Sequence, residues 1–465
     1  MKCLRTSMLV IFVGMAFAIT GCGSAGTTFD ENASDVTAEG YEEPLDMTGE
    51  ELMDMVKQAR DNQTADVGKG LIEDLTGFHI PYDIDTIIDL ADDILKRSKY
   101  ALRFEKIMYN SKDAHGNKVQ LSALLIVPWK LFKKPSLPIL GYNHGTELFR
   151  GNAPSTFKDN PLDVLNVPEV IIASAMASSG YIVVMPDYQG MGESNDIQPY
   201  VHKIQGRQSA DAIKAAKQYT KKPWKFGRLL SPVSWNKKLY LIGYSQGGYV
   251  TMQTAKFLQK RRSKKFPVTA VASLAGPHSI SDVMIDPMTS DNEYKQPFFL
   301  PMVVTAYESI YGSPFTPDEV YVEPFNETLP PLMDGNTKSG TVNAAMGMTT
   351  DPLNFIVPST VLQPELIDEL MDSSSEVRMI LRKNDSHRGW VPQMPIKMFH
   401  HVNDELVMHE NSVVALEKFE SKGAPNVSLE SVTDEIDVRE DSTDTYHAYA
   451  APLIIFKAWE WLLTQ

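Results

Sequence analysis

The stretch that decides the fold reads Leu239-Tyr240-Leu241-Ile242-Gly243-Tyr244-Ser245-Gln246-Gly247-Gly248. Four apolar residues lead into a Gly-x-Ser-x-Gly pattern, and helix-forming residues follow from Tyr249 to Leu258. This order predicts a strand, a sharp turn and a helix, with the hydroxyl of Ser245 exposed on the turn. The residues two before and two after the serine must then lack bulk, and Gly243 and Gly247 meet that demand. The pattern also arises by chance, so other parts of the chain must support Ser245 as a nucleophile.

Strand and helix patterns alternate from about Leu102 onwards. A hairpin is expected over 104–109 and 119–127, because the turn-rich segment 113–117 separates the two runs. Further strands are expected over 138–142, 181–185, from 239, and over 268–274, 395–400 and 427–432. Helices are expected over 167–178, 209–218, 249–258 and 448–463. Such alternation predicts an α/β fold with a doubly wound, mostly parallel sheet covered by helices on both faces.

The same pattern divides the chain into segments. The alternation stops for over a hundred residues after the sixth of these strands, which indicates an insertion in the sheet pattern. Ahead of the sheet, Thr48-Gly49-Glu50-Glu51 is typical of a capping box that opens a helix through Gln58, and a second helix is expected over 84–96. The expected organisation is a signal peptide at 1–21, a flexible tether at 22–45, a helical extension at 46–100, a core at 101–276 and 394–465, and a lid at 277–393.

The first residues resemble an export signal. Lys2 and Arg5 precede the short apolar run 8–19, and Ile19-Thr20-Gly21-Cys22 has the pattern of a lipobox. We therefore expect removal of residues 1–21 and lipidation of Cys22, which would hold the protein on a membrane surface. An ordinary cleaved signal with a chance cysteine is the alternative. No later run is apolar enough to span a bilayer, so we expect a bacterial membrane-anchored lipoprotein of the cell envelope or surface.

Cysteine content and charge narrow the class of protein. The chain has 465 residues and two cysteines, Cys3 and Cys22, so the mature form is expected to contain no intrachain disulfide. Loss of Lys2 and Arg5 with the signal changes the formal net charge from −15 to −17. That charge argues against nucleic acid as a partner. We expect no cofactor and no metal, and the oligomeric state is not indicated.

A serine nucleophile needs a base to accept its proton and an acid to hold that base. On a doubly wound hydrolase sheet, the chain order is serine, then aspartate or glutamate, then histidine. Beyond the resumed strand and its His400-His401 pair lie only His409 and His447. His447 stands between the last strand and the closing helix, where a loop could reach Ser245. His409 is expected on the following helix, so His447 is the predicted base.

Asp404 is the predicted acid because it lies in the loop directly after the resumed strand. Glu405 and Asp444 are the rivals for this role. Asp187, in the loop after the strand 181–185, precedes the serine and is therefore expected to support the structure instead.

Two backbone N–H groups must face the oxygen on which negative charge develops during the reaction. One is expected from Gln246, the residue after the nucleophile. The other is expected from the loop Asn143-His144-Gly145-Thr146, with Thr146 as the predicted donor and Gly145 as the alternative. His144 is expected to be structural and not a second base.

Together these motifs resemble an α/β-hydrolase esterase or lipase, from about residue 100 to the end. The set of His144-Gly145-Thr146, the segment 186–194 and Gly243-Tyr244-Ser245-x-Gly247-Gly248 is most similar to the secretory lipase-like branch. The resemblance implies a triad of Ser245, Asp404 and His447, and a lid between the sixth and seventh strands. Secreted fungal members carry disulfides, whereas this chain is expected to have none. The lid shows no recognised motif, so substrate preference is not implied.

These observations predict a membrane-tethered serine esterase that forms and hydrolyses an acyl-enzyme from a small-molecule or lipid ester. A serine peptidase on the same fold is the first alternative, because the triad does not choose between ester and amide. A surface lipoprotein that only binds is the second, although a binder needs no complete triad. The apolar segment from Pro297 to Tyr311 is expected to form a helix over the mouth of the site.

Overall fold

The computed structural model describes residues 44–67, 84–96, 98, 100–130, 134–221, 233–350, 353–438 and 442–465. All of them belong to one compact unit, Asp35–Gln465. The expected signal peptide, Cys22 and nearly all of the expected tether lie outside the described residues. In the part that is described, no helix combines the length and the apolar character needed to cross a bilayer.

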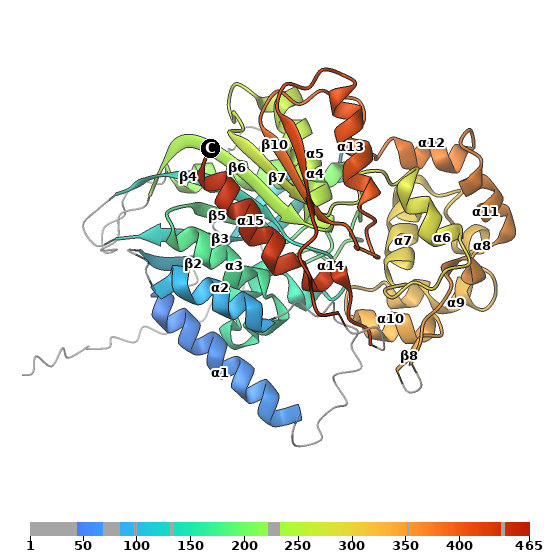
Figure 1. The fold of residues 1–465 in the computed structure, drawn as a ribbon, viewed down its shortest axis with the longest axis horizontal. Coiled ribbons are helices and arrows are strands. Elements are labelled where there is room, and N and C mark those ends of the chain that lie inside the picture. Colours follow the sequence, from blue (N-terminus) through green and yellow to red (C-terminus); the bar gives the residue numbers. More distant parts are fainter. Residues whose placement is uncertain are drawn as a thin grey trace, which may run out of the picture. The chain divides into compact units, whose positions relative to one another are not determined.

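In this part of the chain, nine strands form one sheet in the order β1-β2-β3-β5-β4-β6-β7-β10-β11 (Figure 1). The strands from β5 to β11 in that order run parallel, while β1, β2 and β3 pair antiparallel. Their bounds are β1 Leu45–Met47, β2 Ala101–Lys112, β3 Lys118–Trp129, β4 Ser136–Asn143, β5 Ile182–Pro186, β6 Ser234–Tyr244, β7 Ala270–Leu274, β10 Ile396–His401 and β11 Val427–Val432. The predicted doubly wound, mostly parallel sheet is confirmed.

Helices cover both faces of this sheet. One face carries α1 Gly49–Val67, α2 Ile84–Lys96, α3 Glu169–Ser178 and α15 Ala451–Leu463. The other carries α4 Ile204–Tyr219, α5 Gln246–Arg262 and α13 Glu410–Glu420. The short helix α14 Tyr446–Tyr449 precedes α15.

The two apolar layers follow from the alternation of side chains along each strand. In β5, Val183 and Met185 pack into the layer under α3 and α15, whereas Ile182 and Val184 pack into the layer under α4 and α5. All four side chains are fully buried. A strand buried on both faces must be apolar at every position, which is why the run 181–185 carries no polar residue.

Strand β1 was not expected from the sequence. Leu45–Met47 was assigned to the end of the flexible tether and the start of the helical extension, yet it pairs antiparallel with β2 and becomes an edge of the sheet. Asp46 forms a bidentate ion pair with Arg103, with both N···O distances at 2.7 Å. Three residues are too few to show the alternation that is typical of a strand. Leu45–Met47 is a strand because it pairs with β2, and its own sequence pattern could not predict it. The capping box that follows it is present, with Thr48 and Glu51 bonded to each other's amides.

A helical insertion separates β7 from β10. It contains α6 Asp286–Thr289, α7 Phe299–Tyr311, α8 Pro317–Val320, α9 Phe325–Thr328, α10 Ser339–Ala345, α11 Pro364–Met371 and α12 Glu376–Arg382, with the short strands β8 Thr349–Thr350 and β9 Leu353–Asn354. It has an apolar cluster of its own, to which Tyr200, Tyr249 and Leu406 of the core also belong. The expected helix within 297–311 is α7. That the insertion acts as a lid bounded by 277 and 393 stays a prediction.

Candidate active site

Ser245 stands on the turn between β6 and α5. Its backbone has φ 58° and ψ −124°, in the region that favours glycine. The conformation is held because the Ser245 N–H donates to the carbonyl of Leu274 on β7 at 2.9 Å. It is also held by close packing, since a Cβ on Gly247 would lie 2.0 Å from the carbonyl oxygen of Asn143. The turn therefore has the strained geometry that was predicted from the Gly-x-Ser-x-Gly pattern.

His447 is brought to Ser245 by the loop that follows β11. Its Nε2 lies 2.8 Å from Ser245 Oγ, and its Nδ1 lies 2.6 Å from Asp404 Oδ2. The side chains of Ser245 and Asp404 are buried, as is the imidazole ring between them. The carboxylate can only accept, so Nδ1 carries the proton and Nε2 is left as the acceptor for the serine hydroxyl. The ring is packed against Tyr244, whose hydroxyl donates to the His447 carbonyl at 2.6 Å.

Asp404 lies at the carboxyl end of β10 and is fixed by four partners. Its Oδ1 accepts from the amides of Leu406 and Val407 at 3.1 and 2.9 Å. Its Oδ2 accepts from His447, and His400 Nε2 lies 3.2 Å from the same oxygen. Burial alone would raise the pKa of this carboxyl group, but the two histidines lower it well below its usual range. Asp404 therefore stays ionised.

The rival acids have other partners. Both carboxylate oxygens of Glu405 accept from the amide of Tyr446, the residue before His447, at 3.1 and 3.0 Å. Asp444 receives the ammonium group of Lys295 on its backbone carbonyl at 2.8 Å. His409 precedes α13 directly and contacts Ser431 Oγ at 2.9 Å. The structure thus brings Ser245, His447 and Asp404 together and leaves the alternatives in positions beside them.

Asp187 is buried in a different part of the core. Its Oδ1 accepts from the amide of Ser155 at 2.8 Å, and burial raises the pKa of its carboxyl group. The side chain fixes the loop after β5, in the structural place expected for it.

The loop after β4 lies against the start of α5. Gln246 is the first residue of that helix, so its N–H has no partner within the helix. The Gly145 N–H donates to Glu169 Oε2 at 3.0 Å, which leaves the amide of Thr146 as the donor available in this loop. His144 stacks on Tyr188 with ring centroids 4.2 Å apart, and burial lowers the pKa of its imidazole to about 4. These contacts keep His144 neutral and in a structural position.

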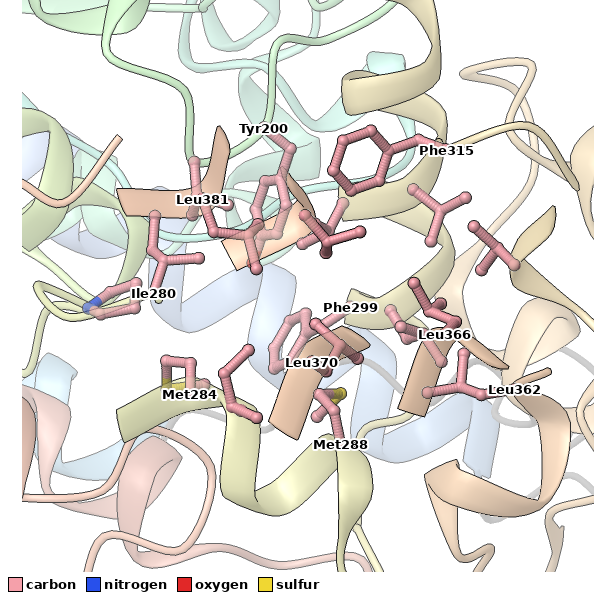
Figure 2. A pocket seen from close by; sticks show the side chains of 18 of the residues that line it. Tyr200, Ile280, Met284, Met288, Phe299, Phe315, Leu362, Leu366, Leu370 and Leu381 are labelled. Atoms are coloured by element: carbon pink, nitrogen blue, oxygen red, sulfur yellow. The ribbon is translucent and has the colours of Figure 1, made fainter. Parts of the chain in front are cut away.

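An apolar cavity opens at Ser245. It lies between the core and the insertion and has a volume of about 120 Å³. Figure 2 shows its aliphatic and aromatic side chains converging from the helices of the insertion. Almost all of the lining is hydrocarbon, and Tyr200, Ser245 and Tyr294 supply the hydroxyl-bearing side chains. Of the two adjacent phenylalanines at the start of α7, Phe298 directly before it and Phe299 as its first residue, Phe299 lines the cavity. A second, smaller cavity of about 20 Å³ is lined by His144 and Gly145 of the loop after β4 and by Glu147 and Glu169.

Several contributors to this site were not predicted. His400, Tyr200 and Glu169 act on the loops and not on Ser245 directly, so no motif marks them. Glu405 was considered only as a rival acid, whereas it binds the Tyr446 amide. The one signal for His400 was its place at the end of a strand, four residues before Asp404. Among the described residues there is no cluster of three or more His, Cys, Asp or Glu side chains that could hold a metal ion.

Known proteins share this fold and part of this sequence. The model of the secretory lipase family matches residues 161–262, which include Ser245. Esterase LipA from Xanthomonas oryzae, a rice cell wall degrading enzyme, is 25% identical with a TM-score of 0.66, over 81% of this chain and 95% of that one. A candidate hydrolase from Legionella pneumophila is 25% identical with a TM-score of 0.65, over 81% of this chain and 94% of that one. None of the curated proteins compared with the chain matches it.

The protein is an α/β-hydrolase of the esterase and lipase class. Candida antarctica lipase A in its closed state has the same fold, with a TM-score of 0.53 and 19% identity over 77% of this chain and 75% of that one. The predicted fold and enzyme class are confirmed, and the match to a secretory family favours export of this hydrolase. The roles of the individual site residues stay predictions.

Proposed function

We propose that this hydrolase cleaves carboxylic esters with an apolar acyl group through an acyl-enzyme on Ser245. Ser245 Oγ attacks the ester carbonyl carbon while His447 Nε2 takes its proton. Asp404 holds the imidazole in the right tautomer and stabilises the cation that forms. The N–H groups of Gln246 and Thr146 bind the oxyanion. His447 then gives its proton to the leaving alkoxide, and the alcohol departs.

Deacylation repeats these steps with water. His447 takes a proton from the attacking water, the hydroxide adds to the acyl carbon, and Ser245 leaves with a proton from the histidine. The carboxylic acid is the second product, and the enzyme returns to its starting state without a redox partner. Each bond that breaks is matched by one that forms at the same carbon.

One observation carries the proposal. His447 has Ser245 Oγ 2.8 Å from one ring nitrogen and Asp404 Oδ2 2.6 Å from the other. A buried aspartate, a buried histidine and a serine with positive φ are costly to retain for structure alone. Their joint presence at one cavity favours catalysis over the alternative of a binding lipoprotein.

The cavity supports the choice of an apolar acyl group. A sugar or a charged acyl group would leave its polar atoms without partners among hydrocarbon side chains, which costs free energy. A long hydrocarbon chain loses no hydrogen bonds on entry and buries apolar surface. We infer that the insertion forms this acyl site as a lid over the core. The predicted export, lipidation of Cys22 and attachment to a membrane surface complete the proposal.

The test is a set of variants assayed with p-nitrophenyl esters beside an aminoacyl-anilide. We expect Ser245→Ala and His447→Ala to lose nearly all ester hydrolysis, on the order of 10⁶-fold in kcat, and Asp404→Asn to lose about 10⁴-fold because the histidine tautomer is lost. Glu405→Gln should retain activity far better than Asp404→Asn. A fluorophosphonate should label the wild type at Ser245, as read by peptide mass spectrometry. Full activity of Ser245→Ala, or faster anilide than ester cleavage, would refute the proposal.

A further inference from the structure

A short segment of the insertion, Tyr294-Lys295, contacts the two loops that carry Asp404 and His447. The segment lies between α6 and α7. Tyr294 donates to the loop after β10 and Lys295 to the loop before α14, at sequence separations of 112 and 149 residues. Tyr294 is also buried and lines the cavity at Ser245. The segment therefore belongs to the cavity wall and at the same time supports the loops of the proposed acid and base.

Tyr294 supports Asp404 through a single peptide group. Its hydroxyl donates to the Leu406 carbonyl at 2.9 Å, and burial raises the pKa of Tyr294 well above its usual value, so the hydroxyl keeps its proton. The N–H of the same peptide group, which belongs to Val407, donates to Asp404 Oδ1 at 2.9 Å. A hydrogen bond to the carbonyl oxygen polarises a peptide group and makes its N–H a stronger donor. Tyr294 thus adds to the stabilisation of the Asp404 charge from one peptide group away.

Lys295 bridges the loop of the acid and the loop of the histidine. Its Nζ donates to the Asp444 carbonyl at 2.8 Å and lies 3.9 Å from Glu405 Oε1. Glu405 in turn accepts from the Tyr446 amide through both carboxylate oxygens, at 3.1 and 3.0 Å. The residue after Tyr446 is His447. One ammonium group therefore fastens the chain before His447 at two points, directly at Asp444 and through Glu405 at Tyr446.

The charge on Lys295 keeps Glu405 a strong acceptor. Burial and the neighbouring Asp404 raise the pKa of Glu405, and Lys295 lowers it. A hydrogen bond to an ionised acceptor is about twice as strong as one to a neutral group, so protonation of Glu405 would loosen the Tyr446 amide. The side chains of Lys295 and Glu405 are 21% and 31% exposed, so the ion pair itself contributes little to stability. Its effect is expected on the position of the loops, and hence on kcat.

We propose that Tyr294 and Lys295 are positioning residues through which the insertion holds Asp404 and His447 at hydrogen-bonding distance from each other and from Ser245. They act through the two loops and not on the reacting atoms. The wall of the acyl cavity and the triad are then joined at this segment. The inference rests on the proposed function, because it needs Asp404 and His447 as acid and base of a reaction at Ser245.

The test measures hydrolysis of p-nitrophenyl butyrate by variants of the segment. Lys295→Met keeps the apolar stem and removes the charge, so kcat should fall roughly thirtyfold, because a displacement of about 1 Å at a reacting centre costs about a hundredfold. KM should stay within about twofold, since Lys295 does not line the cavity. Lys295→Arg should keep kcat within about threefold, because it restores a charged donor. Tyr294→Phe keeps the ring and should lower kcat roughly tenfold.

Each variant has a matched control. Lys397 is 23% exposed, and its Nζ lies 2.7 Å from Glu430 Oε2 in an ion pair between β10 and β11. Lys397→Met and Lys295→Met should have similar Tm values, because both remove a partly exposed ion pair, but Lys397→Met should keep wild-type kcat. For Tyr294→Phe the control is Tyr307→Phe, a fully buried tyrosine of the insertion outside the cavity lining. Its hydroxyl donates to a backbone carbonyl at 3.3 Å, and its loss should leave kcat unchanged.

Two further measurements report on positioning itself. The Nδ1–H of His447, whose nitrogen lies 2.6 Å from Asp404 Oδ2, should give a low-field proton NMR resonance. This resonance should shift or broaden in Lys295→Met and stay unchanged in Lys397→Met, because movement of the loop alters that hydrogen bond. The double variant of Lys295→Met with Glu405→Ala should be no more than about twofold worse in kcat than Lys295→Met alone, since both act on the same loop.

The two levels of the proposal fail differently. If the fluorophosphonate labels Ser245 in the wild type but Lys295→Met keeps wild-type kcat and an unchanged His447 resonance, the positioning inference is wrong and the triad stands. Equal losses of kcat in Lys295→Met and Lys397→Met, or in Lys295→Met and Lys295→Arg, would also overturn it. If Lys295→Met does not fold, Tyr294→Phe decides the question, and wild-type kcat in that variant refutes the inference. If the wild type hydrolyses esters without labelling at Ser245, the proposed function is wrong and the inference falls with it.

Discussion

Two carboxyl groups, Asp404 and Glu147, have pKa values shifted in opposite directions, although burial raises the pKa of both. Asp404 has two histidines and two amides as partners, and they lower its pKa although burial alone would raise it. Glu147 receives one hydrogen bond from Asn152 at 3.2 Å, and burial raises the pKa of its carboxyl group to about 8. The nearby Glu169 carboxylate adds to that rise. Asp404 therefore stabilises the folded state above the pKa of an unfolded aspartate, and that stability is lost as pH falls.

For Glu147 the sign is reversed, which gives a prediction. Between the usual glutamate pKa of about 4.3 and the folded value of about 8, the folded state holds a proton that the unfolded state has released. Stability of the wild type should thus decrease as pH rises through this window. Glu147→Gln removes the ionisation, so its Tm should exceed that of the wild type by about 2 °C or more at pH 8.5, and by less at pH 5. The measurement is thermal unfolding across this pH range.

Because Glu147 keeps part of its surface exposed, the size of this effect is smaller than full burial would give. Glu193→Gln is a matched control, since Glu193 is exposed and paired with Lys106 at 2.7 Å. It should show no gain in Tm as pH rises. A constant offset between Glu147→Gln and the wild type from pH 5 to 8.5 would mean that this carboxyl group is not protonated in the folded state.

At the scale of single residues, chain order and loop position were enough to select Ser245, Asp404 and His447, which the structure brings together. Asp404 and Glu405 differ by one position, and the sequence favoured the first only because it comes sooner after the strand. The structure separates them through their partners, His447 for Asp404 and the Tyr446 amide for Glu405. Tyr200 could not be predicted, because its value depends on a contact with Thr146, 54 residues away.

At the scale of elements, the turn that carries Ser245 is fixed by close backbone packing. The Cα of Gly247 faces the carbonyl oxygens of Asn143 and His144, where a Cβ would lie 2.0 and 2.7 Å away. Strand β6, helix α5 and the loop after β4 therefore meet at one glycine. Any side chain there must push the oxyanion loop away from Ser245.

Gly247→Ala should consequently lose activity by roughly a hundredfold or more, since a shift of about 1 Å at a reacting centre has that effect. The matched control is Gly116→Ala in the β2–β3 turn, where φ is +89° but no atom lies within 4 Å of the added Cβ. The control should lose about 1–2 kcal/mol of stability from its backbone strain and keep its kcat. Activity at 25 °C and Tm of both variants separate the two effects. Retained activity in Gly247→Ala would show that the loop after β4 can move aside without loss of catalysis.

Most elements of the core were predictable because their apolar periods are long. The helix over 84–96 and the strand over 427–432 agree with α2 and β11 in the structure. Helix α4 begins at Ile204, five residues before the prediction, because Gly206 is unfavourable for a helix in sequence yet packs against α5. A Cβ on Gly206 would meet the backbone of Gln253, so this glycine permits close contact between two helices. Intrinsic helix propensity disfavours glycine, so it does not predict a helical glycine that is required for contact with a neighbouring helix.

At the scale of the whole molecule, the insertion and the core share the apolar cavity, and a partly buried ionic network joins the two ends of the insertion to each other. Asp385 accepts from the amide and hydroxyl of Ser281 at 3.0 and 2.7 Å and from Arg388 at 2.7 Å. Arg388 also binds Asp282, which binds Arg378 of α12 at 2.8 Å. Both stems of the insertion are thus fastened to each other beside β7 and β10. No motif in this segment predicts the network, because most of these contacts join residues about a hundred positions apart.

Because the ends of the insertion are fastened, we do not expect its movement to select the acyl group. We expect the side chains that line the cavity to make that selection. Phe298 and Phe299 are consecutive in sequence but face different surroundings. Phe299 lines the cavity, whereas Phe298 is buried in the apolar cluster and packs on Phe299 with ring centroids 4.4 Å apart. The sequence could not separate them, since both fit the apolar face of the predicted helix.

This difference makes the two residues a matched pair for the last prediction. Phe299→Ala enlarges the acyl site, so the ratio of kcat/KM for a p-nitrophenyl laurate to that for a butyrate should change about tenfold, within the 1–3 kcal/mol that such pockets discriminate. Phe298→Ala removes core packing and should lower stability by about 3–5 kcal/mol with an unchanged ratio. Because Phe299 also stacks on Tyr200, its loss can lower kcat for both esters, and only the ratio reports on the cavity. Equal ratios in both variants and the wild type would place the acyl group outside this cavity.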